Sequence, residues 1–442
     1  MKNRIVPALL ALALTAIPGA AQEPLRLTLA DAIRRALDEG TAVRLATSRI
    51  TAAEARAQEA RSGLQPQLSA GGQLANDSIN LATFGFTPPP GQPNVTPPFY
   101  VVDVHLTAAM NVIDLAARRR YEAARAGVRV SAEERRRTEN EVAAAVASLY
   151  VAVGRSGARI DEIRANVDLF ERLRQLAVDQ KDAGLGTRLD TTRADFQLAR
   201  QQQALLVATN QRDVARLALL RAIGADLGAD VTLADDWSRT AAPVPPLAEA
   251  LSAARRDRPE LALVEQRLRV AALEVEAARA ERLPTVAAQA QGVESGNRVR
   301  DVEWNRTIGA VVSVPILTGR RIEARVAAAR SQQEDLRVQQ RDVERQVEQE
   351  VRQALLSWQN ASSRVELAGR SLQLAQDELE LASDRFKAGV APSIEVDNAQ
   401  TSLAAARDLR IDALADEAQA RFDLARATGE IRTLIPGDSH AP

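Results

Sequence analysis

The hydrophobic pattern of the chain changes its period in a fixed order, and the whole order occurs twice. Apolar residues at helical spacing come first, then two runs in which apolar and polar residues alternate, then two more helical stretches separated by a glycine. In the first copy the pattern predicts helices over about 29–40, 41–63, 117–183 and 187–224, with a pair of strands within about 64–113. The chain is therefore predicted to be mainly α-helical with a small sheet.

The alternating runs are the first of two unusual features. From Tyr100 to Val112 the even positions are apolar, whereas the odd positions include Asp103, His105 and Asn111. The second copy has a similar strand pair at about 284–316, with a less regular pattern. Each run has about ten residues, which is the length of a tilted strand that crosses a membrane. Strands of an ordinary soluble sheet are the alternative interpretation.

Four strands in a membrane would need partners from other chains. An open sheet in lipid leaves two edges of unpaired backbone groups, and each such group costs several kcal/mol. Two chains would supply eight strands, whose barrel fills with side chains, whereas three chains would supply twelve and leave an open bore. If the strands lie in a membrane, the pattern favours three chains.

Very long helices are the second unusual feature. Helices are predicted over about 117–183 and 319–388, and each would be roughly 100 Å long at 1.5 Å per residue. A seam spaced three and four residues apart marks the second helix as part of a coiled coil: Val365, Ala368, Leu372, Ala375, Leu379, Ala382 and Phe386. Two shorter helices laid end to end, such as 41–63 and 187–224, would nearly equal one long helix in length.

Direct sequence similarity supports the duplication. The segment from Leu29 to Pro66 aligns without a gap to the segment from Leu247 to Pro284, and "KDAGLGTRLD" ending at Asp190 matches "FKAGVAPSIE" ending at Glu395. The predicted parts of the chain are a signal peptide at 1–21, a first repeat at 22–224, a proline-containing linker at 225–246, a second repeat at 247–430 and a C-terminal tail at 431–442.

The N-terminus predicts export from the cytoplasm. Lys2 and Arg4 precede an apolar stretch at 6–17, and a small-x-small cleavage motif follows before Gln22. The apolar stretch is shorter than the roughly 20 residues of a spanning helix, which argues against a membrane anchor.

Composition excludes several other classes of protein. The 442 residues carry a net charge of −1, which does not suit a nucleic-acid-binding protein. With no cysteine and two histidines, a structural zinc site is not expected, and no metal or cofactor is predicted. The sequence has no phosphate-binding loop and no nucleophile motif, so an enzyme is not predicted either.

With these elements in order, the chain resembles the TolC family of outer-membrane efflux proteins over about 27–430. The motifs that carry the resemblance are "LTLADAIRRALDEG" at 27–40, "RLPTV" at 282–286, "VPILTGRR" at 314–321 and the two hairpin tips. The resemblance implies a homotrimer in the outer membrane of a Gram-negative bacterium, with a twelve-stranded β-barrel continued by a coiled-coil α-barrel in the periplasm. The linker and the tail would form its equatorial region.

The resemblance also implies partners. The family docks on a periplasmic adaptor protein and an inner-membrane pump of the RND, ABC or MFS type, and it exports drugs, metals or polypeptides. The alternative function is a periplasmic coiled-coil adaptor or scaffold without channel activity. Two helical hairpins interleaved with membrane-length strands argue against that alternative.

The tips of the hairpins are the candidate partner site. By position in the family, the adaptor contacts would be Gly184 and Leu185 in the first tip, and Gly389 and Val390 in the second. A purely structural explanation also accounts for the glycines, because a glycine commonly ends a helix in the left-handed conformation. Thr187 and Asp190 would then form a capping box at the start of the next helix.

The family narrows its periplasmic mouth with acidic residues just after each tip. Asp190 and Glu395 occupy these positions, although an acid near a helix N-terminus is also favoured by the helix dipole alone. A second family acid falls at Asn398 here, and a family arginine falls at Ala391. Arg188 and Asp397 are the alternative gate candidates.

Aromatic residues near the strand ends predict contact with lipid headgroups. Outer-membrane strands carry aromatic girdles at both interfaces. The girdle candidates flank the proline-rich stretch 87–98 or begin the last strand: Phe84, Phe86, Phe99, Tyr100 and Trp304.

Overall fold

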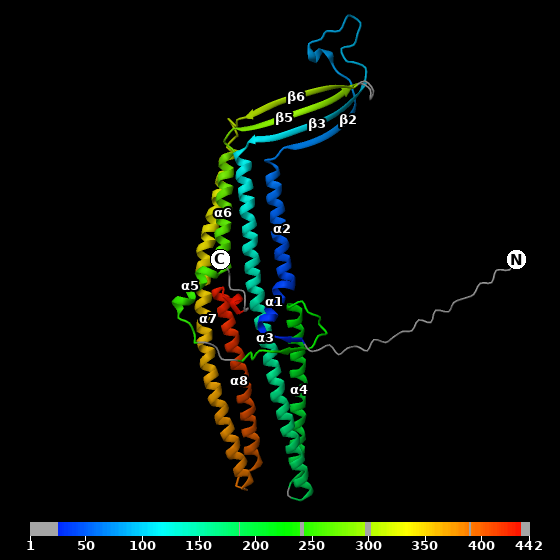
Figure 1. Ribbon diagram of the computed structural model, residues 1–442. Coiled ribbons are helices and arrows are strands. Elements are labelled where there is room, and N and C mark those ends of the chain that lie inside the picture. The colour runs from blue at the N-terminus through cyan, green and yellow to red at the C-terminus, as the bar shows by residue number, and fades with distance from the viewer. Residues whose placement is uncertain (1–24, 185, 239–242, 297–301, 389, 435–442) are drawn as a thin grey trace, which may run out of the picture.

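The protein is a long helical body that carries an antiparallel sheet at one end (Figure 1). The computed structural model describes residues 25–184, 186–238, 243–296, 302–388 and 390–434. The predicted signal peptide lies outside the described residues. Among the helices that are described, none is both long and apolar enough to cross a membrane.

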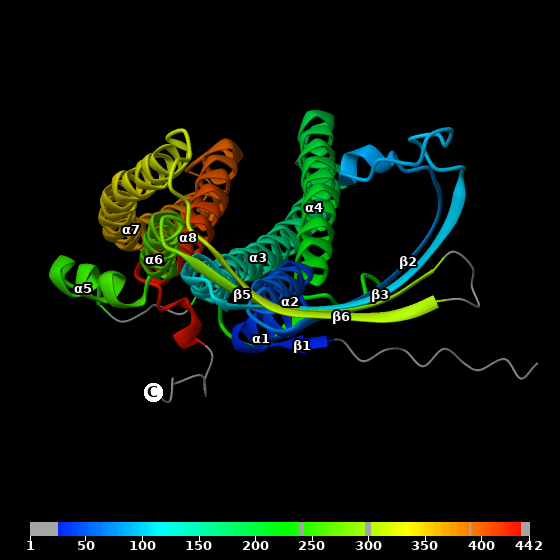
Figure 2. The same ribbon diagram turned by 90° about the horizontal axis from the view of Figure 1, so that it is seen from above.

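The sheet joins the two repeats edge to edge. It contains β2 (Gln67–Asp77), β3 (Phe99–Ile113), β5 (Thr285–Gly296) and β6 (Val302–Ser313), all antiparallel and in that order. The strands curve in an arc (Figure 2), and β2 and β6 form its two unpaired edges. The strands have 11 to 15 residues, which agrees with the length predicted from the alternating pattern.

The register separates an apolar face of the sheet from a polar one. Asp103 pairs with Gln73, and His105 with Gly71, so these positions lie on the same face of the sheet. The opposite face is apolar and uncovered by the rest of the chain, with four of its side chains more than six-tenths exposed: Leu68, Leu74, Ile308 and Val312. An exposed apolar surface of this kind is expected where a protein contacts lipid or another chain.

Two helices run the whole length of the body. These are α3 (Leu115–Asp182) and α7 (Arg321–Lys387), and α3 with its 68 residues is roughly 100 Å long. Above the middle, α2 (Thr41–Ser62) and α6 (Pro259–Ala280) pack beside them. Below the middle their places are taken by α4 (Arg188–Ala222) and α8 (Ser393–Thr428). The predicted end-to-end arrangement is therefore confirmed.

The helices form an open layer rather than a closed bundle. The order of packed neighbours is α2, α3, α6 and α7 in the upper part, and α4, α3, α8 and α7 in the lower part (Figures 1 and 2). One edge of the protomer is therefore α7 along its full length, and the other edge is α2 followed by α4. In the predicted seam of α7, Ala368, Ala375 and Ala382 are buried, as expected.

The main core lies at the middle of the body. There α1 (Leu29–Glu39) packs on α3, β1 (Leu25–Leu27) pairs in parallel with β4 (Val231–Leu233), and α5 (Leu247–Asp257) packs on α7 and α8. The fully buried Tyr150 anchors this region, because its hydroxyl donates to the carbonyl of Leu27 over 3.0 Å. Burial raises the pKa of Tyr150 to about 12, so the hydroxyl stays protonated as a donor.

Candidate functional site

The first hairpin tip is closed by a reciprocal cap. Gly184 has a φ of 75° and follows the end of α3, as predicted for a left-handed terminal glycine. The backbone N–H of Thr187 donates to Asp190 Oδ2 over 3.0 Å, and its hydroxyl donates to the same oxygen over 2.6 Å. In return, the N–H of Asp190 donates to the Thr187 hydroxyl. These hydrogen bonds to the Thr187 side chain and then to its backbone lower the pKa of Asp190. The capping box is therefore present, while Leu185 lies outside the described residues.

The second tip is built differently. Pro392 is the N-terminal cap of α8 and offers no side-chain hydrogen bond. Glu395 instead pairs with Arg385 of the preceding helix, with 3.5 Å between Nε and Oε2. Val390 is 69% exposed, and Gly389 lies outside the described residues. The two tips therefore engage their matched acids in different ways.

A hollow of about 370 Å³ lies where the first tip meets the start of α8. Its wall includes the apolar side chains of Leu173 and Leu176 of α3. Asp190 and Arg193 of α4 and Asp397 of α8 supply its charges. Burial raises the pKa of Asp397, and the positive charge of Arg193 opposes that shift. The hollow therefore unites charges from both repeats.

Only two of the four gate candidates meet in this hollow. Asp190 and Asp397 line it, whereas Glu395 pairs within its own hairpin and Arg188 is exposed outside the hollow. The sequence interpretation missed Arg193. It lies three residues after Asp190, one turn along α4, and that spacing could have identified it as a residue on the same helix face.

The aromatic candidates separate into three groups. Tyr100 and Trp304 lie on the apolar face of the sheet, near the ends of the strands that are remote from the helices, and both are more than half exposed. Trp304 covers Gly292 of the neighbouring strand, where an added Cβ would lie 2.2 Å from the indole ring. Phe99 points to the opposite, polar face by its register, which does not suit the predicted girdle.

Phe84 and Phe86 lie in the connection between β2 and β3, away from the sheet itself. Phe84 ends the short helix η1 (Leu81–Phe84), and both rings are about two-thirds exposed. Both residues therefore lie in the loop beside the proline-rich stretch 87–98, and their contact with lipid stays a prediction.

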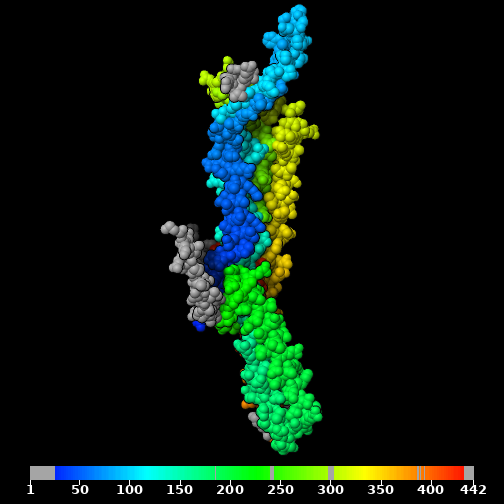
Figure 3. Space-filling model, turned by 90° about the vertical axis from the view of Figure 1, so that its right-hand side faces the viewer, coloured from blue at the N-terminus to red at the C-terminus, as the bar shows by residue number. Residues whose placement is uncertain are grey.

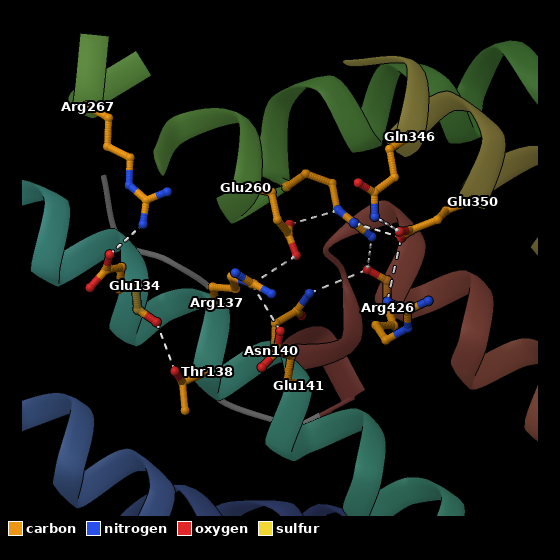
Figure 4. A network of polar contacts seen from close by, with 11 residues as sticks. Glu134, Arg137, Thr138, Asn140, Glu141, Glu260, Arg267, Gln346, Glu350 and Arg426 are labelled. Carbon is orange, nitrogen blue, oxygen red and sulfur yellow. Dashed lines mark hydrogen bonds and ion pairs between the residues drawn. The ribbon is translucent and has the colours of Figure 1, made fainter. Parts of the chain in front are cut away.

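A polar cluster at the middle of the body was not predicted. Figure 4 shows side chains from α3, α6, α7 and α8 converging there. At its centre, the buried Arg258 pairs with Glu350 over 2.8 Å and with Glu260 over 2.9 Å, and it donates to the carbonyl of Arg426 over 3.2 Å. Asn140 of α3 donates to the same carbonyl over 3.4 Å. The cluster caps the C-terminal end of α8 where it meets the start of α6.

Neither region holds an evident catalytic or metal-binding arrangement. Within the described ranges, no group of three or more histidine, cysteine, aspartate or glutamate side chains could hold a metal ion. What the fold and the tips define is an elongated subunit with an open, lipid-compatible sheet at one end and charged helix turns at the other, which is the design of an outer-membrane duct subunit.

Comparison with known proteins gives the family. The chain belongs to the outer membrane efflux protein family, whose model matches residues 32–225 and 250–430. The two matched segments correspond to the two repeats, and the resemblance to the TolC family is confirmed. One relative is the pyoverdine export outer membrane protein OpmQ of Pseudomonas aeruginosa, 25% identical over 317 residues. The match covers 70% of this chain and 65% of OpmQ, slightly less than two thirds of that protein's length.

Solved structures share the fold. The MtrE outer membrane channel of Neisseria gonorrhoeae, in its open state, is 20% identical with a TM-score of 0.77, and the match covers 93% of this chain and 91% of MtrE. The CmeC outer membrane channel of Campylobacter jejuni is 15% identical with a TM-score of 0.79, covering 91% of this chain and 85% of CmeC. At these identities the likeness establishes the fold.

Proposed function

We propose that three copies of this chain form an outer-membrane efflux channel. Each copy would supply four strands to a twelve-stranded barrel and four helices to the tube that continues it. The observation that carries the proposal is the open four-stranded sheet above an open layer of helices. The sheet and the helical layer both end in unpaired edges on the same two sides of the protomer. A single rotation that relates the copies can therefore close both layers into rings.

Apolar stripes on the edge helices support this closure. On α4, Leu189, Phe196 and Leu206 are each more than half exposed. On α7, the exposed side chains recur at intervals of eleven and then seven residues, namely Leu356, Leu367, Leu374 and Leu381. Helices that present such stripes usually bury them against a partner helix. In a ring of three, α7 of one copy would meet α2 and α4 of the next.

The channel would be passive and would work with partners. The tube offers a bore that selects by size and charge, and it supplies no energy and no catalytic step of its own. An inner-membrane pump would drive transport, and a periplasmic adaptor protein would connect the pump to the hairpin tips. At the second tip the exposed Val390 offers an apolar contact for the adaptor.

The charges at the tips would control the mouth of the tube. Asp190, Arg193 and Asp397 face a single hollow between the two hairpins, so changes in that hollow would alter how the hairpins pack. Replacing Asp397 with asparagine is expected to raise the open probability of the channel. Glu395→Gln is the matched control, because Glu395 pairs within its own hairpin. Equal effects of the two substitutions would contradict this assignment.

The decisive experiment combines mass and conductance. The protein would be extracted in detergent from purified outer membranes, its native mass measured, and its single-channel conductance recorded in a planar bilayer. A trimer with a defined conductance is the expected result. A monomer in the soluble periplasmic fraction without channel activity would refute the proposal.

A further inference from the structure

A groove on the α7 edge of the protomer has the character of a binding site. It has a volume of about 720 Å³ and lies between α5, α6 and α7. Its walls include the apolar side chains of Leu251, Leu261 and Val347. Five arginines and three glutamates line it, which gives the groove an excess of positive charge.

Several of these charges have no partner within the protomer. Among the described residues, Arg255, Arg341 and Arg345 make no ion pair or hydrogen bond through their side chains, and all three are exposed. Of the glutamates, Glu348 pairs with Arg352 over 2.7 Å, whereas Glu265 and Glu344 make no ion pair among the described residues. Three unpaired arginines therefore face two unpaired glutamates in the groove. The groove is therefore suited to an occupant that combines an apolar group with negative charge.

A turn on the opposite edge of the protomer has this combination. Asp226, Leu227 and Asp230 lie in the turn that follows α4, and Leu227 is 51% exposed between the two acids. The turn is held in shape, because Arg216 of α4 donates to the carbonyl of Ala229 over 2.9 Å. The amide of Gly228 also donates to the Asp226 carboxylate.

The groove and the turn lie at the same level on opposite flanks. Figure 1 shows α5 on one side of the middle of the body and the green segment after α4 on the other, and Figure 3 shows that green segment on the side facing the viewer. Rotation about the long axis of the body keeps every residue at its own height. A ring of copies would therefore bring the turn of one copy to the groove of the next.

We infer that the 226–230 turn of one copy inserts Leu227 into the α5–α7 groove of its neighbour, with Asp226 facing the groove's arginines while Asp230 stays paired with Arg216 of its own chain over 3.6 Å. The contact would lock neighbouring protomers at the equator of the tube. This inference rests on the proposed trimer, and it specifies the residues that join its subunits.

Disulfide crosslinking tests the contact directly, because the chain has no cysteine of its own. The full-length double variant Leu227→Cys with Arg345→Cys, oxidised in the outer membrane, is expected to give covalent dimers and trimers on a non-reducing denaturing gel. The matched control pairs Leu227→Cys with Arg370→Cys, which is an exposed position roughly 37 Å further along α7 at 1.5 Å per residue. The control and both single-cysteine variants are expected to remain uncrosslinked.

Charge reversal provides a second, independent test. Arg341→Glu combined with Arg345→Glu is expected to lower the temperature at which the detergent-extracted trimer dissociates, and adding Asp226→Arg is expected to restore part of the loss. If the wild-type protein is a trimer but the Leu227→Cys, Arg345→Cys variant does not crosslink, or the charge reversals act additively, this inference is overturned and the channel proposal stays intact. A monomeric wild-type protein would overturn both.

Discussion

Replacing Arg258 with alanine tests whether the joint between α6 and α8 depends on a buried charge. The side chain of Arg258 is 2% exposed, and it contacts Glu260, Glu350 and the carbonyl of Arg426. Removing one partner of a buried ion pair typically costs about 3–5 kcal/mol, because the remaining charge is left without compensation. Two features reduce the cost here. Glu350 keeps a second arginine, Arg426, at 3.5 Å, and the carbonyl of Arg426 keeps its hydrogen bond from an asparagine of α3.

The expected loss is therefore at the lower end of that range, about 3 kcal/mol. The loss would be measured as a fall in the unfolding temperature of the helical signal by circular dichroism, with the protein in detergent at fixed concentration. The matched control is Arg34→Ala, since Arg34 pairs with Asp31 over 3.2 Å and both side chains are about half exposed. An exposed pair contributes about 0–1 kcal/mol, so the control should change little. If the two variants have the same unfolding temperature, the buried pair does not stabilise the joint and the reasoning is refuted.

Three further predictions concern the helical body. Thr187→Ala removes the reciprocal cap and should destabilise the start of α4 by about 1 kcal/mol, seen as faster amide hydrogen exchange there, whereas Thr187→Ser should not. Gly154→Ala puts a Cβ 2.3 Å from the Trp237 ring; it should cost about 1–3 kcal/mol and shift tryptophan emission, unlike Gly157→Ala, where the space is open. Burial, and then a neighbouring aspartate of α8, raise the pKa of Glu162 to about 7 from its ordinary 4.5. Its contribution to stability is therefore present below pH 4.5 and lost as the pH rises through about 7, and Glu162→Gln should flatten this dependence in melts between pH 4 and 8.

The helical body was predictable because its signals are long and local. A 68-residue helix repeats its pattern many times, and the predicted and observed ends of α3 differ by two residues or fewer. The strands were located less accurately. The first was predicted from residue 64, but β2 begins at Gln67, because the amides of Leu64 and Gln65 still bond to the last turn of α2. An alternating pattern cannot reveal that hydrogen bonding.

The buried cluster could not be predicted, because comparison of the two repeats gives no indication that Arg258 is buried. In the alignment of the repeats, Arg258 matches Gly40, and both residues end the first short helix of their repeat. An arginine at a helix end normally indicates a solvated charge that complements the helix dipole. Arg258 is buried because α8, which is distant in sequence, packs against it. Gly429 at the end of α8 lies so close that an added Cβ would be 2.6 Å from the carbonyl of Asp257.

The hairpin tips show how duplicated sequence can give unequal chemistry. Asp190 and Glu395 are equivalent in the alignment, but the first is bound by its own Thr187 and the second by Arg385. At the tip, Asp397 of the second repeat lines the hollow beside the first hairpin, and its equivalent in the first repeat is Thr192. Three copies would therefore place a ring of three hollows at the end of the tube, each containing acids from both repeats and one arginine. Because these charges line one hollow between the hairpins of each copy, the proposed opening of the mouth would change the packing around them.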